Sequence, residues 1–362
     1  MGAEFGSNVL NILGNGKAVL SSIAPALIER TDKDALMTAR SNSYEGINNC
    51  VLCNIQNTRY PFMVADNSFN TLSAFRNEMR ENIIRVGIIP ANSALFTEMV
   101  KQGNGGIWFS ACREGLYETY LPVMEKLIDK PTYIFVFDND ENITKIARER
   151  CRNSNIHILK CILHSVCSNI EYNREKHTVH MTCGKECLLV FPPEAWELRS
   201  LLKSNPFFGR AEFLFTDSED AFKFFELWKP LGINVLHTLA SVKAYVEGVN
   251  QGMSLNEITQ KRFSDVISEQ ETLDHTLRVY EVFFDKYLAP YAYTIQTTKE
   301  NLVTITTEFV KGLFRLEETV GRGLNPRDSS FDSKLKRHFP YLRASNDQET
   351  ISMVDEFIKL LR

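Results

Sequence analysis

The fold class is decided by a short stretch, Leu13-Gly14-Asn15-Gly16-Lys17-Ala18-Val19, that joins an apolar strand pattern to a helical one. Residues 8–13 suit a short strand, and residues 19–29 carry apolar side chains at helical spacing. A Gly-x-Gly between a strand and a helix gives a tight turn whose backbone N–H groups can approach a pyrophosphate. The stretch therefore predicts a dinucleotide site at Gly14, Asn15, Gly16 and Lys17. Val19 replaces the usual third glycine, and the alternative is an ordinary left-handed turn.

Outward from this turn, strand-sized apolar runs alternate with helical patterns. Further strands are expected at 35–39, 83–89, 106–110 and 132–137, and helices at 114–127 and 142–152. This alternation predicts an α/β domain with a mostly parallel, doubly wound sheet. Residues 161–192 break the rhythm and predict an antiparallel extension with a hairpin that turns at Gly184-Lys185.

Strand signals fade after residue 200. Capping boxes are expected at 216–219 and 254–257, and long helical patterns run through 255–288, 298–317 and 346–361. We therefore expect two domains: residues 8–200 form the dinucleotide-binding domain with its antiparallel extension, and residues 201–362 form an all-α substrate domain.

Composition excludes several classes of protein. The 362 residues include 41 Lys+Arg and 45 Asp+Glu, and a net charge of −4 argues against a nucleic-acid binder. No apolar run approaches the roughly 18 residues of a membrane span. Without a leader pattern, the eight cysteines suggest reduced thiols in a cytoplasmic protein. A zinc site at His177, His180, Cys183 and Cys187 is disfavoured because strand alternation separates the two histidines, so no metal is expected.

The second strand ends without the acid that usually holds the adenosine ribose of NAD. Arg40 and Ser41 stand there instead. A guanidinium and a hydroxyl suit a 2′-phosphate better than a ribose diol, which favours NADP. The alternative is a plain surface arginine.

The segment from Lys229 to Ala244 carries the most specific polar pattern. In a helix after Gly232, one aliphatic stripe is formed by Val235, Leu239, Val242 and Val246. Asn234 and His237 are i, i+3 neighbours on the opposite side, where small residues follow and would let another segment approach. Lys229 precedes Pro230 and is expected in a break before the helix.

The pattern Lys229-x4-Asn234-x2-His237 resembles the signature of the polyol-specific long-chain dehydrogenases/reductases, the mannitol dehydrogenase family, and most of all its short mannitol-1-phosphate 5-dehydrogenase branch. Further similar segments are Gly14-Asn15-Gly16, Ser110-Ala111-Cys112, Asp138-Asn139 and Val320-Gly321-Arg322. The sequence departs from the family at the third glycine, at Arg40, and at Ser168-Asn169, where Asp-Arg is typical.

The resemblance implies a Rossmann-like N-terminal domain followed by an all-α domain like that of 6-phosphogluconate dehydrogenase. It implies a monomeric oxidoreductase that uses NAD or NADP to interconvert a polyol, such as a sugar-alcohol phosphate, and its ketose. Lys229 would be the general acid/base, while Asn234 and His237 polarise the substrate oxygen. Ser110, Ala111, Asp138 and Asn139 would bind the cofactor, and Arg322 the substrate. Alternatives are a hexuronate reductase, a non-catalytic dinucleotide sensor and, for Arg322, a surface salt link.

Overall fold

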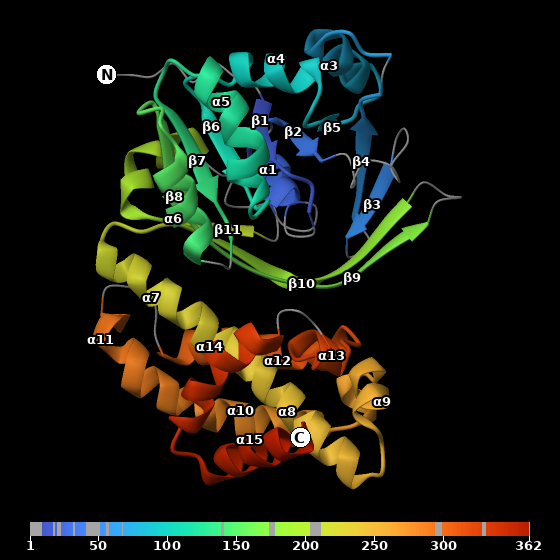
Figure 1. The fold of residues 1–362 in the computed structure, drawn as a ribbon, viewed down its shortest axis with the longest axis vertical. Coiled ribbons are helices and arrows are strands. Elements are labelled where there is room, and N and C mark those ends of the chain that lie inside the picture. Colours follow the sequence, from blue (N-terminus) through green and yellow to red (C-terminus); the bar gives the residue numbers. More distant parts are fainter. Residues whose placement is uncertain are drawn as a thin grey trace. The chain divides into compact units, whose positions relative to one another are not determined.

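The computed structural model describes most of the chain and divides it into two compact units, Met1–Asp217 and Ser218–Arg362 (Figure 1). The first unit extends beyond residue 200 because a strand at Ala211–Phe215 still pairs with its sheet, so the boundary expected near residue 200 lies too early. The residues described are 9–16, 19, 23–31, 33–40, 51–55, 58–66, 68–138, 141–173, 178–202, 211–293, 299–327 and 331–361.

An 11-stranded sheet forms the centre of the first unit. Its strands are β1 (Val9–Leu13), β2 (Asp34–Ala39), β3 (Val51–Ile55), β4 (Thr58–Val64), β5 (Val86–Pro90), β6 (Ile107–Ser110), β7 (Thr132–Val136), β8 (Ile156–Lys160), β9 (Ile162–Asn173), β10 (Thr178–Phe191) and β11 (Ala211–Phe215). The run β5-β2-β1-β6-β7-β8 is parallel throughout. This is the strand order of a dinucleotide-binding sheet, and it confirms the α/β class expected from the sequence.

Helical segments cover both faces of the sheet, as the doubly wound prediction requires. They are α1 (Ala24–Thr31), α3 (Leu72–Glu81), α4 (Ala94–Gln102), the π-helix η2 (Leu116–Tyr120), α5 (Leu121–Leu127), α6 (Glu141–Arg150) and the 3-10 helix η3 (Pro193–Leu202). One apolar core joins α1 and η3 to one face, and a second core joins α3, α4, α5 and α6 to the other (Figure 1). The sheet is therefore buried on both sides, which explains the continuous apolar runs of its parallel strands.

The antiparallel extension consists of β9 and β10, as predicted, but it turns elsewhere. β10 pairs with β9 along both ends of its length, and Gly184-Lys185 lies inside β10, in a stretch where the register shifts between Cys183 and Cys187. Glycine in a strand commonly marks such a bulge, so the hairpin expected at this dipeptide was wrong. β10 also pairs with β3 near its start and with β11 near its end.

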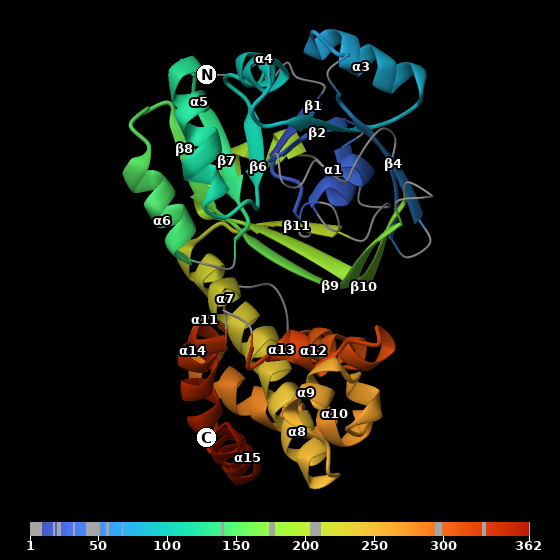
Figure 2. The same cartoon turned by 45° about the vertical axis from the view of Figure 1, so that its right-hand side comes forward.

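The regular elements described in the second unit are all helical (Figure 2). Its segments are α7 (Glu219–Lys229), the π-helix η4 (Pro230–Asn234), α8 (Val235–Asn250), α9 (Leu255–Gln260), the 3-10 helix η5 (Phe263–Asp265), α10 (Glu269–Phe283), the π-helix η6 (Phe284–Leu288), α11 (Ala289–Ala292), α12 (Lys299–Arg315), α13 (Val320–Gly323), α14 (Phe331–Arg343) and α15 (Gln348–Leu360). Helix α8 is central: α9, α10, α13, α14 and α15 all pack against it. Its stripe of Val235, Leu239, Val242 and Val246 is buried, as predicted.

Helix starts in this unit follow local side-chain chemistry. The capping box predicted at Ser254 is present, with Glu257 completing it. At the start of α7 the capping residue is Ser218, whose side chain accepts from the N–H of Ala221, rather than Thr216 as predicted.

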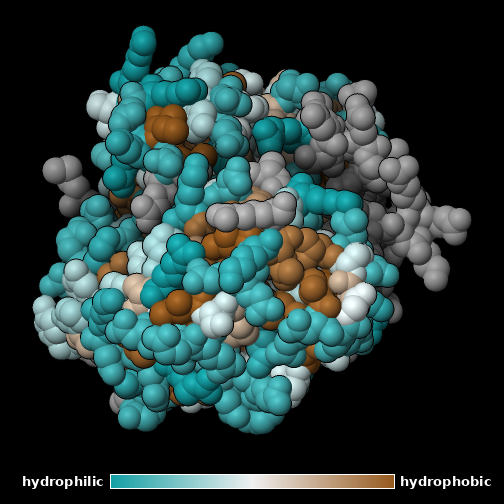
Figure 3. All heavy atoms as spheres, turned by 60° about the horizontal axis from the view of Figure 1, so that its bottom comes forward, coloured by the Kyte–Doolittle hydropathy of each residue, from teal (hydrophilic) through white to brown (hydrophobic). Residues whose placement is uncertain are grey.

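In the face drawn in Figure 3, polar residues surround a smaller group of apolar ones. Among the described residues, no helix is long and apolar enough to cross a membrane.

Candidate functional site

The Gly-x-Gly turn lies at the carboxyl end of β1, and its first position requires glycine. Gly14 has φ +91°, and a Cβ there would lie 2.8 Å from the Cβ of Cys112. The N–H of Gly14 donates to the Thr38 hydroxyl at 2.8 Å, which ties the turn to the end of β2. Gly14 and Asn15 are buried and Gly16 is exposed. The turn therefore presents backbone at the place where open α/β sheets bind their ligands.

Buried polar groups from the neighbouring strand support this turn. Ser110, at the end of β6, has its hydroxyl 3.1 Å from the Cys112 thiol. Burial raises the pKa of Cys112 to about 12, so this thiol stays protonated. Burial likewise raises the pKa of Tyr120 to about 12, and its hydroxyl lies near Thr38 and the backbone of Gly14 without completing a hydrogen bond. No local pattern singles out Thr38 or Tyr120, because the residues that lie near them are distant along the chain.

Of the other residues expected to bind the cofactor, those that the structure describes lie at the same edge of the sheet. Arg40 is exposed at the end of β2, and a Cβ on Gly115 would lie 3.4 Å from its guanidinium carbon. Ala111 follows β6 and Asp138 follows β7, and both are half-buried. Lys17 and Asn139 lie outside the described residues. The carboxyl ends of β1, β2, β6 and β7 thus bring the described members together.

In the second unit, a π-helical turn replaces the break expected at Pro230. α7, η4 and α8 follow one another directly, and the N–H of Val235 donates to the carbonyl of Pro230, five residues back. In an uninterrupted α-helix, Lys229 and Asn234 would lie about 140° apart around the axis. The wider turn absorbs one residue, which places Asn234 and His237 about 40° and 20° from Lys229.

Burial agrees with this geometry. Lys229, Asn234 and His237 are each half-buried, whereas Trp228 and Val235 are buried. The structure therefore brings an amine, a carboxamide and an imidazole to one helix face, which we call the polar face. Spacing alone placed only Asn234 and His237 together.

The His237 ring lies in a mixed pocket of apolar rings and charges. Its centroid is 5.9 Å from those of Phe263 and Phe309. Its Nε2 lies 3.7 Å from a carboxylate oxygen of Glu318, and the other neighbour of that oxygen is Nε of Arg322 at 3.2 Å. Burial lowers the pKa of His237, and the Glu318 charge opposes this shift. Arg322 thus lies beside His237, as a substrate-binding role would need, but it is engaged in the salt link of the alternative interpretation.

Sequence reasoning missed two further groups near this face. Lys334 donates to the carbonyls of Arg322 and Gly323 at 3.1 and 3.0 Å and so caps α13. His338 lies 2.7 Å from the Thr238 hydroxyl, which itself donates to the carbonyl of Asn234. Burial lowers the pKa of His338 to about 4, so its ring is neutral near pH 7.

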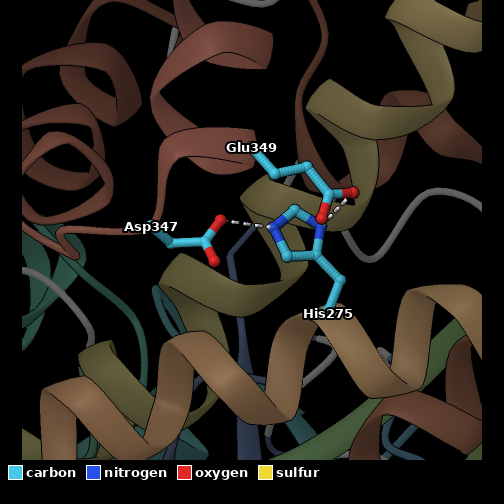
Figure 4. A group of neighbouring side chains, drawn as sticks. All are labelled: His275, Asp347 and Glu349. Atoms are coloured by element: carbon cyan, nitrogen blue, oxygen red, sulfur yellow. Dashed lines mark hydrogen bonds and ion pairs between the residues drawn. The ribbon is translucent and has the colours of Figure 1, made fainter.

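One side-chain group among the described residues has metal-ligand spacing: His275, Asp347 and Glu349 offer atoms within 4.8 Å of one another (Figure 4). The two carboxylates, however, approach opposite ring nitrogens, with Asp347 3.2 Å from Nε2 and Glu349 3.6 Å from Nδ1. Arg278 also pairs with both carboxylates. This geometry fits an ionic link between α10 and the start of α15 better than one shared metal ion, which needs converging ligands.

No protein-family model matches the chain. No curated protein matches it either. Among solved structures, the chain is similar to 2-dehydropantoate 2-reductase from Geobacter metallireducens GS-15, with 12% identity over 97% of this chain and 99% of that one and a TM-score of 0.51. A PanE/ApbA family ketopantoate reductase from Ralstonia eutropha JMP134 shows 10% identity over 98% of each chain, with a TM-score of 0.45. At this identity the likeness shows the fold, a Rossmann-like domain followed by a helical domain of the 6-phosphogluconate dehydrogenase kind.

This finding corrects the family suggested by the sequence. The solved structure whose likeness shows the fold is a 2-dehydropantoate 2-reductase, and nothing in the comparisons supports the mannitol dehydrogenase family or an activity on polyols and sugar phosphates. The physical reason is the shortness of the pattern. Lys229, Asn234 and His237 describe one face of one helix, and a face of that kind does not define a family.

Proposed function

We propose that the chain is an oxidoreductase that uses NAD or NADP to interconvert a small carbonyl compound and its alcohol. The observation that carries this proposal is the Gly14 turn at the carboxyl end of β1, in a sheet ordered β5-β2-β1-β6-β7-β8. In open α/β sheets, ligands bind beyond the carboxyl ends of the strands, where the strand order reverses. β1 lies at that point, between β2 and β6.

The residues present fit a dinucleotide. A Cβ at Gly14 would fill the space against Cys112, so the backbone at this turn stays bare for a phosphate. Gly14, Asn15 and Gly16 would hold the pyrophosphate, and Arg40 would lie near the adenosine ribose at the end of β2. When bound, the nicotinamide would supply or accept the hydride.

The polar face of the second unit would supply the groups that handle the substrate oxygen. An ammonium group can give a proton to a carbonyl oxygen and take it back from an alcohol, which is the role we assign to Lys229. Asn234 would donate an amide N–H to the same oxygen, and His237 would hydrogen-bond the substrate. Because all three lie on one helix face, one rigid element would set their relative positions.

A substrate panel followed by nicotinamide absorbance tests the activity. The panel begins with 2-dehydropantoate, the substrate in the name of the Geobacter metallireducens enzyme. Other 2-oxo acids and simple ketones follow, each with NADH and NADPH. We expect turnover of at least one carbonyl compound, and its loss in Lys229→Ala. If no compound is reduced with either cofactor, or if Lys229→Ala retains the wild-type rate, the proposed function is wrong.

A further inference from the structure

Glu318 is a buried carboxylate whose position the backbone fixes on both sides. The preceding residue, Glu317, has φ +50° and ends α12 with a left-handed turn. The carbonyl of Glu318 accepts from the N–H of Phe263 at 3.0 Å, and the N–H of Val320 donates to Lys261 at 2.9 Å. As a result the Glu318 side chain is 2% exposed, whereas that of Glu317 is 61% exposed.

The contacts of this carboxylate are incomplete. Its Oε1 meets Arg322 Nε at 3.2 Å and His237 Nε2 at 3.7 Å, and the second distance is too long for a hydrogen bond. Both Glu318 Oε2 and His237 Nε2 are buried and have no hydrogen-bond partner. A buried polar atom without a partner costs about 1–3 kcal/mol, and this contact leaves one such atom on each of two neighbouring side chains. Such contacts often shorten only when a site is occupied.

The surroundings of His237 make Glu318 its natural partner. Arg322 from α13, and Lys334 and His338 from α14, are the other charged or titratable groups that act on the ring. All three are cations when protonated, so Glu318 is the anion among the described groups around His237. The side chain of His237 is 19% exposed although its Nε2 is buried. Its exposed part therefore lies away from Glu318.

The close contact of α13 explains why the ring can be held this way. A Cβ on Gly323 would lie 2.7 Å from Cδ2 of His237 and 2.9 Å from its carbonyl oxygen. The Ser241 hydroxyl lies 3.1 Å from the carbonyls of His237 and Val320. Only glycine lets α13 approach α8 so closely, and this approach brings Arg322 and Glu318 to the ring.

We propose that Glu318 is a positioning residue of the site: it orients the His237 ring and keeps the ring proton on Nε2, so that Nδ1 is left to accept a hydrogen bond from a substrate hydroxyl. The role of Nδ1 rests on the proposed function, whereas the orientation by Glu318 is a property of the free protein. A carboxylate that faces one ring nitrogen selects the tautomer with its proton on that nitrogen. The same arrangement would favour a substrate that carries a hydroxyl group near the reacting carbonyl.

The 15N chemical shifts of the His237 ring test the orientation without any substrate. In the full chain we expect the Nε2–H tautomer, assigned by comparison with His237→Gln. In Glu318→Gln the shifts should move toward a mixture of tautomers, and the titration midpoint of His237 should fall because the opposing negative charge is gone. Glu317→Gln is the matched control and should leave both unchanged. An Nδ1–H tautomer in the wild type overturns the proposal, and so does an unchanged midpoint in Glu318→Gln.

Steady-state kinetics of Glu318 variants test whether the orientation of His237 matters for turnover. With a substrate found in the panel, Glu318→Gln should lower kcat/KM by about 10–100-fold, as the loss of a supporting carboxylate typically does. Glu318→Asp should recover part of it. If no substrate is ever turned over, the proposed function fails while the tautomer of His237 still decides the orientation. Should Glu318→Gln fail to fold, the wild-type tautomer alone decides it.

Discussion

Two histidine clusters in the second unit use the same kinds of groups and satisfy them differently. His275 on α10 hydrogen-bonds through Nε2 to Asp347 at 3.2 Å and to the Thr350 hydroxyl at 2.8 Å. Asp347 also caps α15 by accepting from the N–H of Thr350 at 2.8 Å. His237 on α8 has no such bond at Nε2, although Glu318 lies 3.7 Å away.

The difference lies in the carboxylate that faces each unsatisfied ring nitrogen, which is exposed in the first cluster and buried in the second. In the first cluster His275 Nδ1 also lacks a hydrogen-bond partner, but the carboxylate that faces it, Glu349 at 3.6 Å, is 49% exposed and free to move closer, so the network can complete itself. In the second cluster a buried carboxylate and a buried ring nitrogen are left incomplete beside a face that also carries Lys229 and Asn234. Incomplete buried polar groups are expected where a ligand or a reaction makes use of them.

The largest expected effect comes from removing the amine of the polar face. Lys229→Ala should lower turnover by about 10²–10⁴-fold, because the proton donor is lost, while the free energy of unfolding changes little. Lys223→Ala removes an exposed cation from the same helix and should leave turnover unchanged. Steady-state kinetics and urea unfolding of both variants check this.

A substitution in the His275 cluster should have the opposite pattern of effects, on stability and not on turnover. Asp347→Ala should lower the free energy of unfolding by about 1–2 kcal/mol through the lost helix cap, without changing turnover per folded molecule. A drop in turnover for Asp347→Ala, or none for Lys229→Ala, would show that the two clusters do not differ in their effects on stability and turnover.

Two glycines of the second unit differ in the space around them, and substitution by alanine should therefore have opposite effects on stability. A Cβ at Gly323 would press on His237 and Ser241, and Gly323→Ala should destabilise the protein by about 2 kcal/mol and also lower turnover. Gly312, inside α12, has nothing within 4 Å, so Gly312→Ala should stabilise the protein by up to about 1 kcal/mol. Thermal unfolding of both variants gives the signs. Equal effects would show that α13 does not approach α8 as described.

Much of the fold followed from the sequence because local rules decided it. The buried stripe of α8 was legible from its periodicity, and the Ser254–Glu257 box from its chemistry. The π-helical turn was not, because Pro230 predicts a break and no local rule says that a helix will widen one turn instead. The hairpin predicted at Gly184-Lys185 was wrong for a related reason, since a glycine is typical of turns and of β-bulges alike.

The site was only partly predictable because its partners come from distant segments. Lys229, Asn234 and His237 lie within nine residues, so their pattern could be read. Glu318 is 81 residues beyond His237, and in sequence it cannot be distinguished from Glu317. The left-handed turn at Glu317 leaves the Glu317 side chain exposed and buries that of Glu318. The same short pattern also misled the assignment of family, since it reports one helix face and nothing more.

A pH series extends the comparison to the histidine that supports the polar face. His338 has a pKa near 4 when folded and an ordinary value of 6.5 when unfolded, so between these values the unfolded chain binds more protons. The free energy of unfolding should therefore fall as the pH drops from 6.5 to 4, by an amount on the order of 2 kcal/mol from this group. Burial lowers the pKa of His275 and His237 as well, which adds loss in the same direction.

His338→Gln should make the fall shallower, as measured by urea midpoints at pH 7 and pH 4.5. If the variant and the wild type lose stability in parallel, His338 is not held neutral by burial.

A further prediction concerns the first unit, where Arg40 is the charged group expected near the ribose. Arg40→Asp should shift the ratio of NADPH to NADH affinity toward NADH by about 10–100-fold, because one charge-assisted contact is worth about 1.5–3 kcal/mol. Arg80→Asp, in the last turn of α3, offers a control at another exposed arginine of the same unit. An unchanged ratio in Arg40→Asp would show that this guanidinium does not select the cofactor.

Calorimetric titration of the full chain with NADPH and NADH tests the central claim, that the turn at Gly14 is a dinucleotide site. We expect one dinucleotide to bind per chain and Gly14→Ala to abolish the binding, because a Cβ there meets Cys112. Gly252→Ala is the control, since Gly252 has φ +85° but open space around it. No heat of binding in the wild type, or equal affinity in Gly14→Ala, would show that the turn at Gly14 is not a dinucleotide site.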